Sequence, residues 1–127
     1  MDANLLLWIG QVLLALALLG VGYSHSIGFE QASARPGMGW MTAVGRERMF
    51  AIGILEILGA IGLIGPAVTG ILPWLTPLAA ASFALLMVFA IVLHARRPGE
   101  GRNVVVNVIL GLFAALIAFG RFVVAPL

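Results

Sequence analysis

The stretch that decides the fold is Met49–Gly65, MFAIGILEILGAIGLIG, in which Glu56 is the only charged residue. A helix rises about 1.5 Å per residue, so this stretch covers most of the hydrocarbon core of a bilayer, which is about 30 Å thick. Pro66 follows directly and is expected to end the helix, because proline has no backbone N–H. The stretch therefore predicts a membrane-spanning helix with one carboxyl group inside the bilayer.

Three further runs of the chain are similarly apolar. Together with the first stretch they predict spans at about residues 5–23, 49–65, 75–93 and 104–124. Lipid offers the backbone no hydrogen-bond partner, so each run has to be helical even where it contains several valines. Two short connections and one longer connection then join the helices in alternating directions. The sequence predicts an all-α integral membrane protein, with a single domain over residues 1–127 built as a four-helix up-down bundle.

The composition excludes several classes of protein. Hydrophobic residues make up 62% of the 127 residues and charged residues only 9%. A soluble domain carries about a quarter charged residues, so these are too few to cover a water-facing surface. The chain has no cysteine, which excludes disulfides, thiolate metal sites and iron–sulfur clusters. Its arginines stand in separate short segments and form no basic patch, so nucleic acid is not an expected partner.

The arginines predict how the protein lies in its membrane. Six of the seven fall in two connections: Arg35, Arg46, Arg48, Arg96, Arg97 and Arg102. Only Arg121 belongs to the opposite side. Cytoplasmic loops of membrane proteins are enriched in arginine and lysine. We therefore expect residues 25–48 and 94–103 to be cytoplasmic and both termini to lie outside. The expected location is the plasma membrane, which is the inner membrane in bacteria.

The connection over residues 25–47 is the longest segment that does not span the membrane. Glycines and a proline interrupt it, and several large apolar residues accompany them: Ile27, Phe29, Met38, Trp40 and Met41. These residues predict a segment that lies on the membrane surface or re-enters the membrane. Long connections of this kind often carry function.

Glu56 is the sharpest candidate for a functional group. It lies near the predicted midplane of the bilayer, where a charged side chain is costly and needs a reason. Gly53, Gly59 and Ala60 share its helix face, and small residues mark helix contacts in membranes, so Glu56 is expected to point into the bundle. Two roles remain open for it. One is a protonated carboxyl group hydrogen-bonded across helices, and the other is an acid/base group that exchanges a proton or binds a polar ligand.

Two other helices carry a stripe of polar and small residues. In the first run the stripe consists of Gln11, Ala15, Leu18, Gly22 and His25. In the fourth run it consists of Asn107, Gly111, Ala114, Ala118 and Arg121. These stripes predict a partly polar interior in which Glu56 lies between two levels. One level is at the cytoplasmic end and the other at the outer end.

The polar side chains of these stripes each have two interpretations. Gln11 and Asn107 are interhelical hydrogen-bond partners or contacts for a ligand. Arg121 extends outward to the interface or joins the ligand-binding residues. His94 is expected to lie in the membrane interface. The candidate catalytic residues are Glu56 and His25. The candidate ligand-binding residues are Gln11, Glu56, Asn107 and Arg121. No metal site is predicted, because two histidines and one carboxylate do not form a recognisable ligand set.

Four segments carry a family resemblance: GILEILGAIGLIGP at 53–66, LPWLTPLAA at 72–80, His94-Ala-Arg-Arg97 and Gly120-Arg121-Phe122. From Gly39-Trp40 onward the chain resembles the DoxX-like family of small membrane proteins. The resemblance implies a four-helix integral membrane fold, with Glu56 and Arg121 as part of the family's pattern. Many relatives have a lysine near the end of the first helix, where this chain has Tyr23-Ser24-His25.

The resemblance implies a function only in outline. The family is named after a subunit associated with quinol oxidase and thiosulfate:quinone oxidoreductase systems, and other members are linked to membrane oxidoreductase complexes. The leading hypothesis is therefore an accessory subunit of a quinone-linked membrane redox system. The alternatives are a membrane enzyme that uses Glu56 as acid/base on a hydrophobic small molecule, and a small transporter or proton pathway. Expected partners are the bilayer and either an oxidoreductase subunit or further copies of the chain, and quinone is the cofactor that the resemblance suggests.

Overall fold

The computed structural model describes residues 2–127, which form helices and connections but no strand. The long helices are α1 (Ala3–His25), α4 (Arg46–Thr69), α5 (Leu75–Ala95) and α6 (Gly101–Phe119), and α6 continues as a π-helical turn, η1 (Gly120–Val124). Two short helices, α2 (Phe29–Ser33) and α3 (Gly39–Val44), lie between α1 and α4. The four long helices are long and apolar enough to cross a membrane. The predicted all-α membrane bundle is confirmed.

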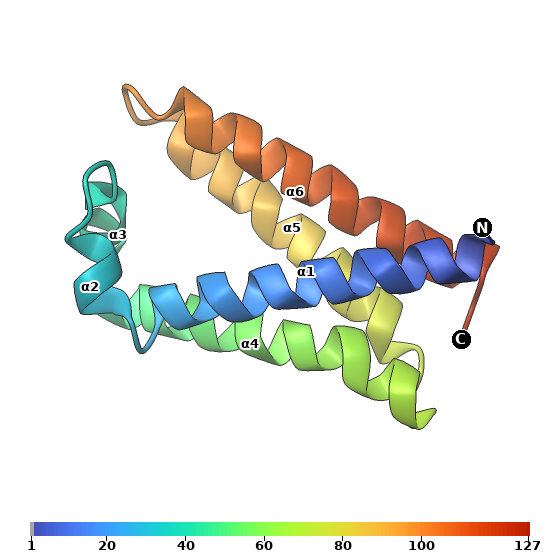
Figure 1. Ribbon diagram of the computed structural model, residues 1–127. Helices are drawn as coiled ribbons and strands as arrows, with labels where there is room; N and C mark the ends of the chain where they lie inside the picture. Colours follow the sequence, from blue (N-terminus) through green and yellow to red (C-terminus); the bar gives the residue numbers. More distant parts are fainter. Residues whose placement is uncertain (1) are drawn as a thin grey trace.

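The long helices form two antiparallel pairs, α1 with α4 and α5 with α6, which are joined where α4 packs on α5 (Figure 1). The pairs diverge toward the end that holds α2, α3 and the connection from α5 to α6 (Figure 1). We call this end the loop end, and the opposite end, with both termini, the terminal end. Both arginine-bearing connections lie at the loop end, as the alternating helix directions predict.

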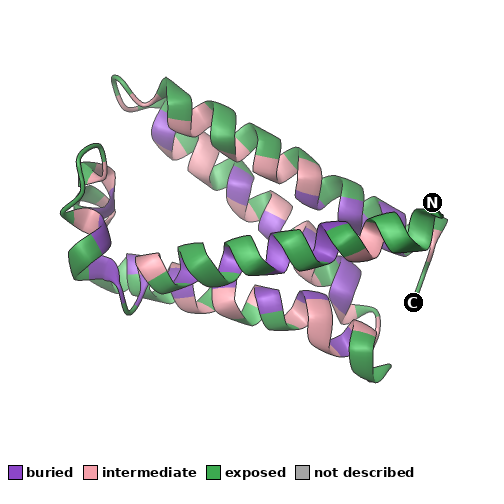
Figure 2. Ribbon diagram, viewed as in Figure 1, coloured by how far each residue is buried: buried purple, intermediate pink, exposed green. Residues whose placement is uncertain are grey.

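The outer faces of the helices are exposed, as Figure 2 shows, and they carry many large apolar side chains. Leu112, Leu116 and Phe119 follow one side of α6 and are 63%, 67% and 58% exposed. Lipid, whose tails are as apolar as these side chains, is the solvent that suits such a surface. The buried core is formed mainly by Leu14, Leu18, Ala60, Leu63, Ala80, Phe83, Ala114 and Ile117. This core fills the middle and the terminal half of the bundle and leaves the loop half to other groups.

Two facing glycines set the closest approach of α1 and α4. A Cβ atom on Gly53 would lie 2.5 Å from the carbonyl oxygen of Gly22, and one on Gly22 would lie 2.7 Å from the carbonyl oxygen of Gly53. Nothing larger than hydrogen fits there without a shift, and small residues are what allow such close crossings in membranes. Gly22 lies three residues before His25, and Gly53 three before Glu56. The crossing therefore brings these two side chains into one region of the bundle.

Pro66 does not end α4, and the prediction that it would is wrong. The helix runs on to Thr69. Proline removes the N–H that would bond the carbonyl of Gly62, one turn earlier. The hydroxyl of Thr76 on α5 donates to that carbonyl at 3.2 Å. A neighbouring helix thus supplies the missing donor, which is how membrane helices tolerate proline.

The connection between α1 and α4 has a small hydrophobic cluster of its own at the loop end. Its buried members are Phe29, Ala32, Met41 and Met49. They fasten α2 and α3 against the start of α4. Gly45 joins α3 to α4 with a φ of 104°, a conformation that glycine adopts without the steric cost of a Cβ atom. This anchored connection carries Trp40 to the interior side of the loop end.

The glycine crossing generates a stability prediction. We expect Gly53→Ala to lower the free energy of unfolding by about 1–3 kcal/mol, because overpacking forces the two backbones apart. Gly20→Ala, also on α1, is the control, since a Cβ atom there would meet nothing within 4 Å. Denaturant unfolding in a mild detergent, followed by helical circular dichroism, measures both. Equal stability of the two variants would contradict the crossing.

Candidate functional site

His25 and Glu56, the two predicted catalytic residues, are in contact. Nδ1 of His25 lies 2.9 Å from Oε2 of Glu56, and the side chains are only 13% and 2% exposed. Helical side chains lean toward the N-terminus of their own helix. Because α1 and α4 are antiparallel, the two side chains lean toward each other from either side of the glycine crossing. A hydrogen bond between an imidazole and a carboxyl group is an arrangement used in general acid–base chemistry.

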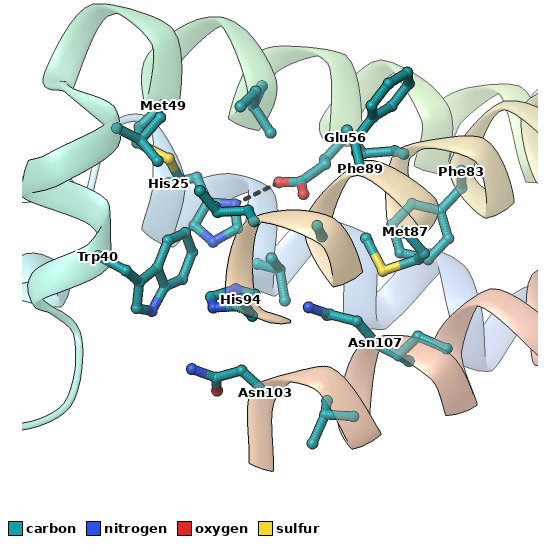
Figure 3. Close-up of a pocket in the computed structure, with 18 of the residues that line it drawn as sticks. His25, Trp40, Met49, Glu56, Phe83, Met87, Phe89, His94, Asn103 and Asn107 are labelled. Carbon is teal, nitrogen blue, oxygen red and sulfur yellow. Dashed lines mark hydrogen bonds and ion pairs between the residues drawn. The ribbon is translucent and has the colours of Figure 1, made fainter. Parts of the chain in front are cut away.

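The indole of Trp40 lies between the imidazoles of His25 and His94 (Figure 3). Its centre is 5.7 Å from the His25 ring and 4.7 Å from the His94 ring, at interplanar angles of 83° and 80°. Edge-to-face packing of this kind is favourable between aromatic rings. Since the three residues come from α3, α1 and α5, the stack joins the anchored connection to both helix pairs.

The indole nitrogen of Trp40 is buried and has no hydrogen-bond partner within residues 2–127. A buried indole N–H normally finds an acceptor, and one without a partner needs an explanation. Trp40 also lines the cavity described below. An acceptor atom of a bound molecule would meet this need.

His94 lies in the last turn of α5 at the loop end, and its side chain is buried against neighbouring protein groups. Its position in the membrane interface stays a prediction. Its side chain is 4% exposed, and its Nδ1 lies 2.6 Å from Oε1 of Glu100. Nε of Arg97 donates to the other oxygen of the same carboxylate at 2.5 Å. With Nδ1–H donated to Glu100, Nε2 of His94 is left as a hydrogen-bond acceptor. His94 and Glu100 therefore form a second histidine–carboxylate pair, and Trp40 packs against the histidine of each pair.

Glu100, in the connection between α5 and α6, is held in its ionised form. Desolvation raises the pKa of its carboxyl group. Hydrogen bonds from His94 and Arg97, together with the positive charge of Arg97, outweigh desolvation and hold the pKa below its ordinary value of 4.5. Glu100 thus serves as a fixed acceptor that orients the His94 ring.

A cavity of about 580 Å³ lies at the loop end, where the helix pairs diverge. Its volume is within the range of small-molecule sites, about 300–1,000 Å³. Most of its wall is apolar and includes Phe83, Met87 and Phe89 (Figure 3). The polar and charged residues on its wall are His25, Trp40, Arg48, Glu56, His94, Arg97, Asn103 and Asn107. An apolar pocket with a few converging polar groups is the usual form of a ligand site.

At the terminal end, Arg121 is buried, so it does not extend outward to the interface. Its Nε donates to Oε1 of Gln11 at 2.5 Å, and its Nη1 donates to Asn4 at 2.7 Å and to the carbonyl of Ala125 at 3.0 Å. Gln11 donates in turn to the carbonyl of Leu63 at 2.8 Å. Gln11 is therefore an interhelical hydrogen-bond partner, one of its two predicted roles.

The structure separates the predicted ligand-binding residues into two groups. Glu56 and Asn107 line the loop-end cavity, whereas Gln11 and Arg121 bond to each other at the terminal end. Glu56 joins the level of His25 instead of standing between two levels. The stripes predict which helix face a side chain lies on. They do not predict how far the side chain extends along the helix axis.

Sequence reasoning missed Trp40, His94 and Glu100 as members of this site. For Trp40 no pattern in the chain indicates that α3 folds over the end of the bundle. For the other two the signal is the spacing His94, Arg97 and Glu100 around Pro98-Gly99, where a turn brings residues six apart together. As for metals, no group of three histidine, aspartate or glutamate side chains comes together in the described part of the chain. Proton donors and acceptors around an apolar cavity are thus the chemical equipment of the site.

The Arg121 network generates a stability prediction. Gln11→Leu leaves Nε of Arg121 without a partner, whereas the carbonyl of Leu63 keeps the hydroxyl of Thr76 at 3.4 Å. We expect the unpaired Nε to cost about 1–3 kcal/mol of unfolding free energy. Asn4→Ala is the control, because Asn4 is exposed and Arg121 Nη1 keeps the bond to Ala125. Denaturant titration in detergent measures both variants. A Gln11→Leu protein as stable as the wild type would show that the network adds nothing.

Glu100 generates a pH prediction. Its pKa is lower in the folded than in the unfolded protein, so its stabilisation is complete above about pH 4.5 and is lost as the pH falls through the lowered value. We expect Glu100→Gln to lower the unfolding midpoint at neutral pH and to match the wild type in acid. Thermal unfolding across the pH range measures this.

The matched control for that series is Glu30→Gln. Glu30 pairs with Arg46, but both side chains are about two-thirds exposed, at 68% and 66%. Exposed pairs contribute little, so this variant should follow the wild type at every pH. A Glu100→Gln effect that does not change with pH would refute the assigned ionisation.

Comparison with known proteins gives one match. A model of the DoxX-like family matches residues 9–117, whereas no curated protein and no solved structure matches the chain. The matched residues run from α1 into the last turns of α6 and include both histidine–carboxylate pairs and Trp40. Arg121 lies just beyond them. Because the match covers most of the chain, this integral membrane protein belongs to the DoxX-like family.

Proposed function

We propose that the protein binds a quinone-class molecule in the loop-end cavity and serves as an accessory subunit of a quinone-linked membrane redox system. One observation carries the proposal. The buried indole N–H of Trp40 has no partner among the described residues, and the indole ring packs against His25, the partner of Glu56, in the wall of a mostly apolar cavity. A molecule that fits must be largely apolar, must accept a hydrogen bond and must tolerate a neighbouring proton donor.

A quinone ring meets these requirements. It is flat and apolar, and its carbonyl oxygens accept hydrogen bonds, which the N–H of Trp40 and the amide of Asn107 are able to donate. In Figure 3 the side chain of Asn107 extends across the cavity toward His94. The reduced ring carries hydroxyl groups, for which Nε2 of His94 is an acceptor. The wall thus offers partners to both forms of the ring.

The His25–Glu56 pair is proposed to exchange the proton. When a quinone becomes a hydroquinone, each carbonyl oxygen gains one proton and the ring gains two electrons. The electrons come from a partner oxidoreductase, the class of partner that the accessory role requires. The pair lies in the cavity wall with side chains only 13% and 2% exposed, so it is placed to give one of the two protons to a ring oxygen or to accept one. The second proton is proposed to come from water at the loop end.

The proposed orientation places the cavity near the cytoplasmic leaflet. Both arginine-bearing connections lie at the loop end, and the positive-inside rule assigns that end to the cytoplasm. The protein then resides in the plasma membrane (the inner membrane of a bacterium), with both termini outside. A partner subunit that supplies electrons would dock at the cytoplasmic loop end.

The second candidate function is an enzyme that acts on another hydrophobic small molecule. It is favoured by the same 2.9 Å contact, since a carboxyl group oriented by an imidazole is equipped for acid–base catalysis without a partner. The two functions differ in what Glu56→Gln does. An enzyme loses turnover of its own, whereas an accessory subunit loses a bound ligand or proton exchange within a complex.

The proposal predicts a loss of affinity in Trp40→Phe. Phenylalanine keeps a ring between the two histidines but has no N–H, and one lost hydrogen bond weakens binding about tenfold. Trp74→Phe is the control, because Trp74 is exposed outside the cavity. Titration of a short-chain benzoquinone into protein in lipid nanodiscs measures the affinities, and native mass spectrometry of gently extracted protein identifies the natural ligand.

Two outcomes would contradict the proposal. The first is a wild-type protein that carries no quinone and binds none. The second is equal affinity for quinone in the Trp40→Phe and Trp74→Phe variants. Glu56→Gln, with the exposed Glu47→Gln on the same helix as control, then separates the two candidate functions by assaying turnover and retained ligand.

A further inference from the structure

A second hollow of about 580 Å³ lies along α4 and α5. Its floor includes small residues from both helices, Gly59, Gly62, Ala79 and Ser82. Its rim is made of large apolar side chains that face outward, among them Leu55, Leu58, Leu78 and Leu85, all 44–63% exposed. We call this hollow the groove. It is open to the surroundings of the bundle, which in a membrane are lipid tails.

The groove continues the loop-end cavity lengthwise. Five residues line both hollows: Leu18, Glu56, Phe83, Leu86 and Phe89. Along α4 the cavity uses residues 48–56 and the groove residues 55–66. Glu56 therefore stands where the two hollows meet, with the cavity toward the loop end and the groove toward the middle of the membrane.

The polarity of the two hollows differs in the same direction. Several polar residues line the cavity and not the groove: His25, His94, Trp40, Asn103 and Asn107. Apart from Glu56 at the junction, the only polar side chain in the groove is the hydroxyl of Ser82. A polar end near the membrane surface and an apolar end toward the midplane is how an amphiphile lies in a leaflet.

We propose that the groove holds the hydrocarbon tail of the molecule whose ring binds in the cavity, and that this molecule enters sideways from the bilayer between α4 and α5. The inference rests on the proposed function and narrows its ligand class to quinones with a long apolar tail. Lipid tails are as apolar as the groove, so the gain is close packing and restricted position rather than transfer from water. The tail thereby directs the ring toward Trp40.

Phe83 and Phe89 on α5 both line the cavity and the groove at their junction. Phe89 is 65% exposed, whereas Phe83 is buried. A tail that lies across the junction contacts both rings. The cavity that receives the ring lies at the loop end, where the helix pairs diverge (Figure 1).

The test fills the groove and compares two ligands. Ser82→Phe places a large ring on the groove floor, Ser82→Ala removes only the hydroxyl, and Val88→Phe places the same ring on an exposed face of α5 outside both hollows. The ligands are a decyl-substituted benzoquinone and the same ring with a methyl group. Affinities are measured in one batch of nanodiscs, so that partition into lipid cancels between variants.

We expect Ser82→Phe to weaken binding of the decyl compound about tenfold, as overpacking of an occupied site does, and to leave the methyl compound unchanged. Ser82→Ala and Val88→Phe should match the wild type with both ligands. Helical circular dichroism confirms folding, and Ser82→Leu replaces Ser82→Phe if the larger side chain unfolds the protein.

Other outcomes overturn the inference in distinguishable ways. If the wild type binds both ligands and Ser82→Phe binds the decyl compound as tightly, the tail lies elsewhere and only the groove is refuted. If Ser82→Phe weakens both ligands equally, the substitution has distorted the cavity and the groove has no separate role. If the wild type binds neither ligand, the proposed function fails and the groove assignment fails with it.

Discussion

Lipid cannot hydrogen-bond to a polypeptide, and this constraint shapes the whole bundle. Each backbone group is satisfied within its own helix, and each exception is repaired by a neighbour. Thr76 bonds the carbonyl that Pro66 leaves open, and Gln11 bonds the next carbonyl along while it also accepts from Arg121. These bonds run between α1, α4, α5 and the end of α6. They close the terminal half of the protein around polar groups that would otherwise be costly in lipid.

The loop half is packed differently from the terminal half, because the helix pairs diverge there. The glycine crossing holds α1 against α4, while α5 and α6 move away and the α2–α3 connection covers the end. Polar groups collect in the space that results. Each imidazole is paired with a carboxylate, and Trp40 packs against both rings. Two buried donors have no partner among the described residues: the indole N–H of Trp40 in this half, and Nη2 of Arg121 in the terminal half. Only the donor of Trp40 belongs to a residue that lines the cavity between the diverging helix pairs.

The cavity and the groove together indicate which kind of molecule the loop half could bind. The cavity combines proton donors, acceptors and an apolar wall near the membrane surface, and the groove extends it toward the midplane with little polarity. The proposed ligand, a lipid-soluble ring with a tail, would occupy both parts in the orientation that an amphiphile takes in a leaflet. The terminal Arg121 network bonds within the bundle and acts there as a structural element.

Sequence alone determined the fold, because the insertion of each span into a bilayer depends on its length and hydropathy, which are local properties of the chain. The inward direction of Gln11 and Glu56 also followed from helical periodicity and small neighbours. Contacts between helices could not be predicted in this way, since periodicity gives the face of a residue and not its partner. Tertiary structure decided that Glu56 meets His25, that Gln11 holds Arg121, and that His94 is buried. The physical reason is that these contacts depend on where helices cross and on how a loop folds back, and both are set by packing between segments far apart in the chain.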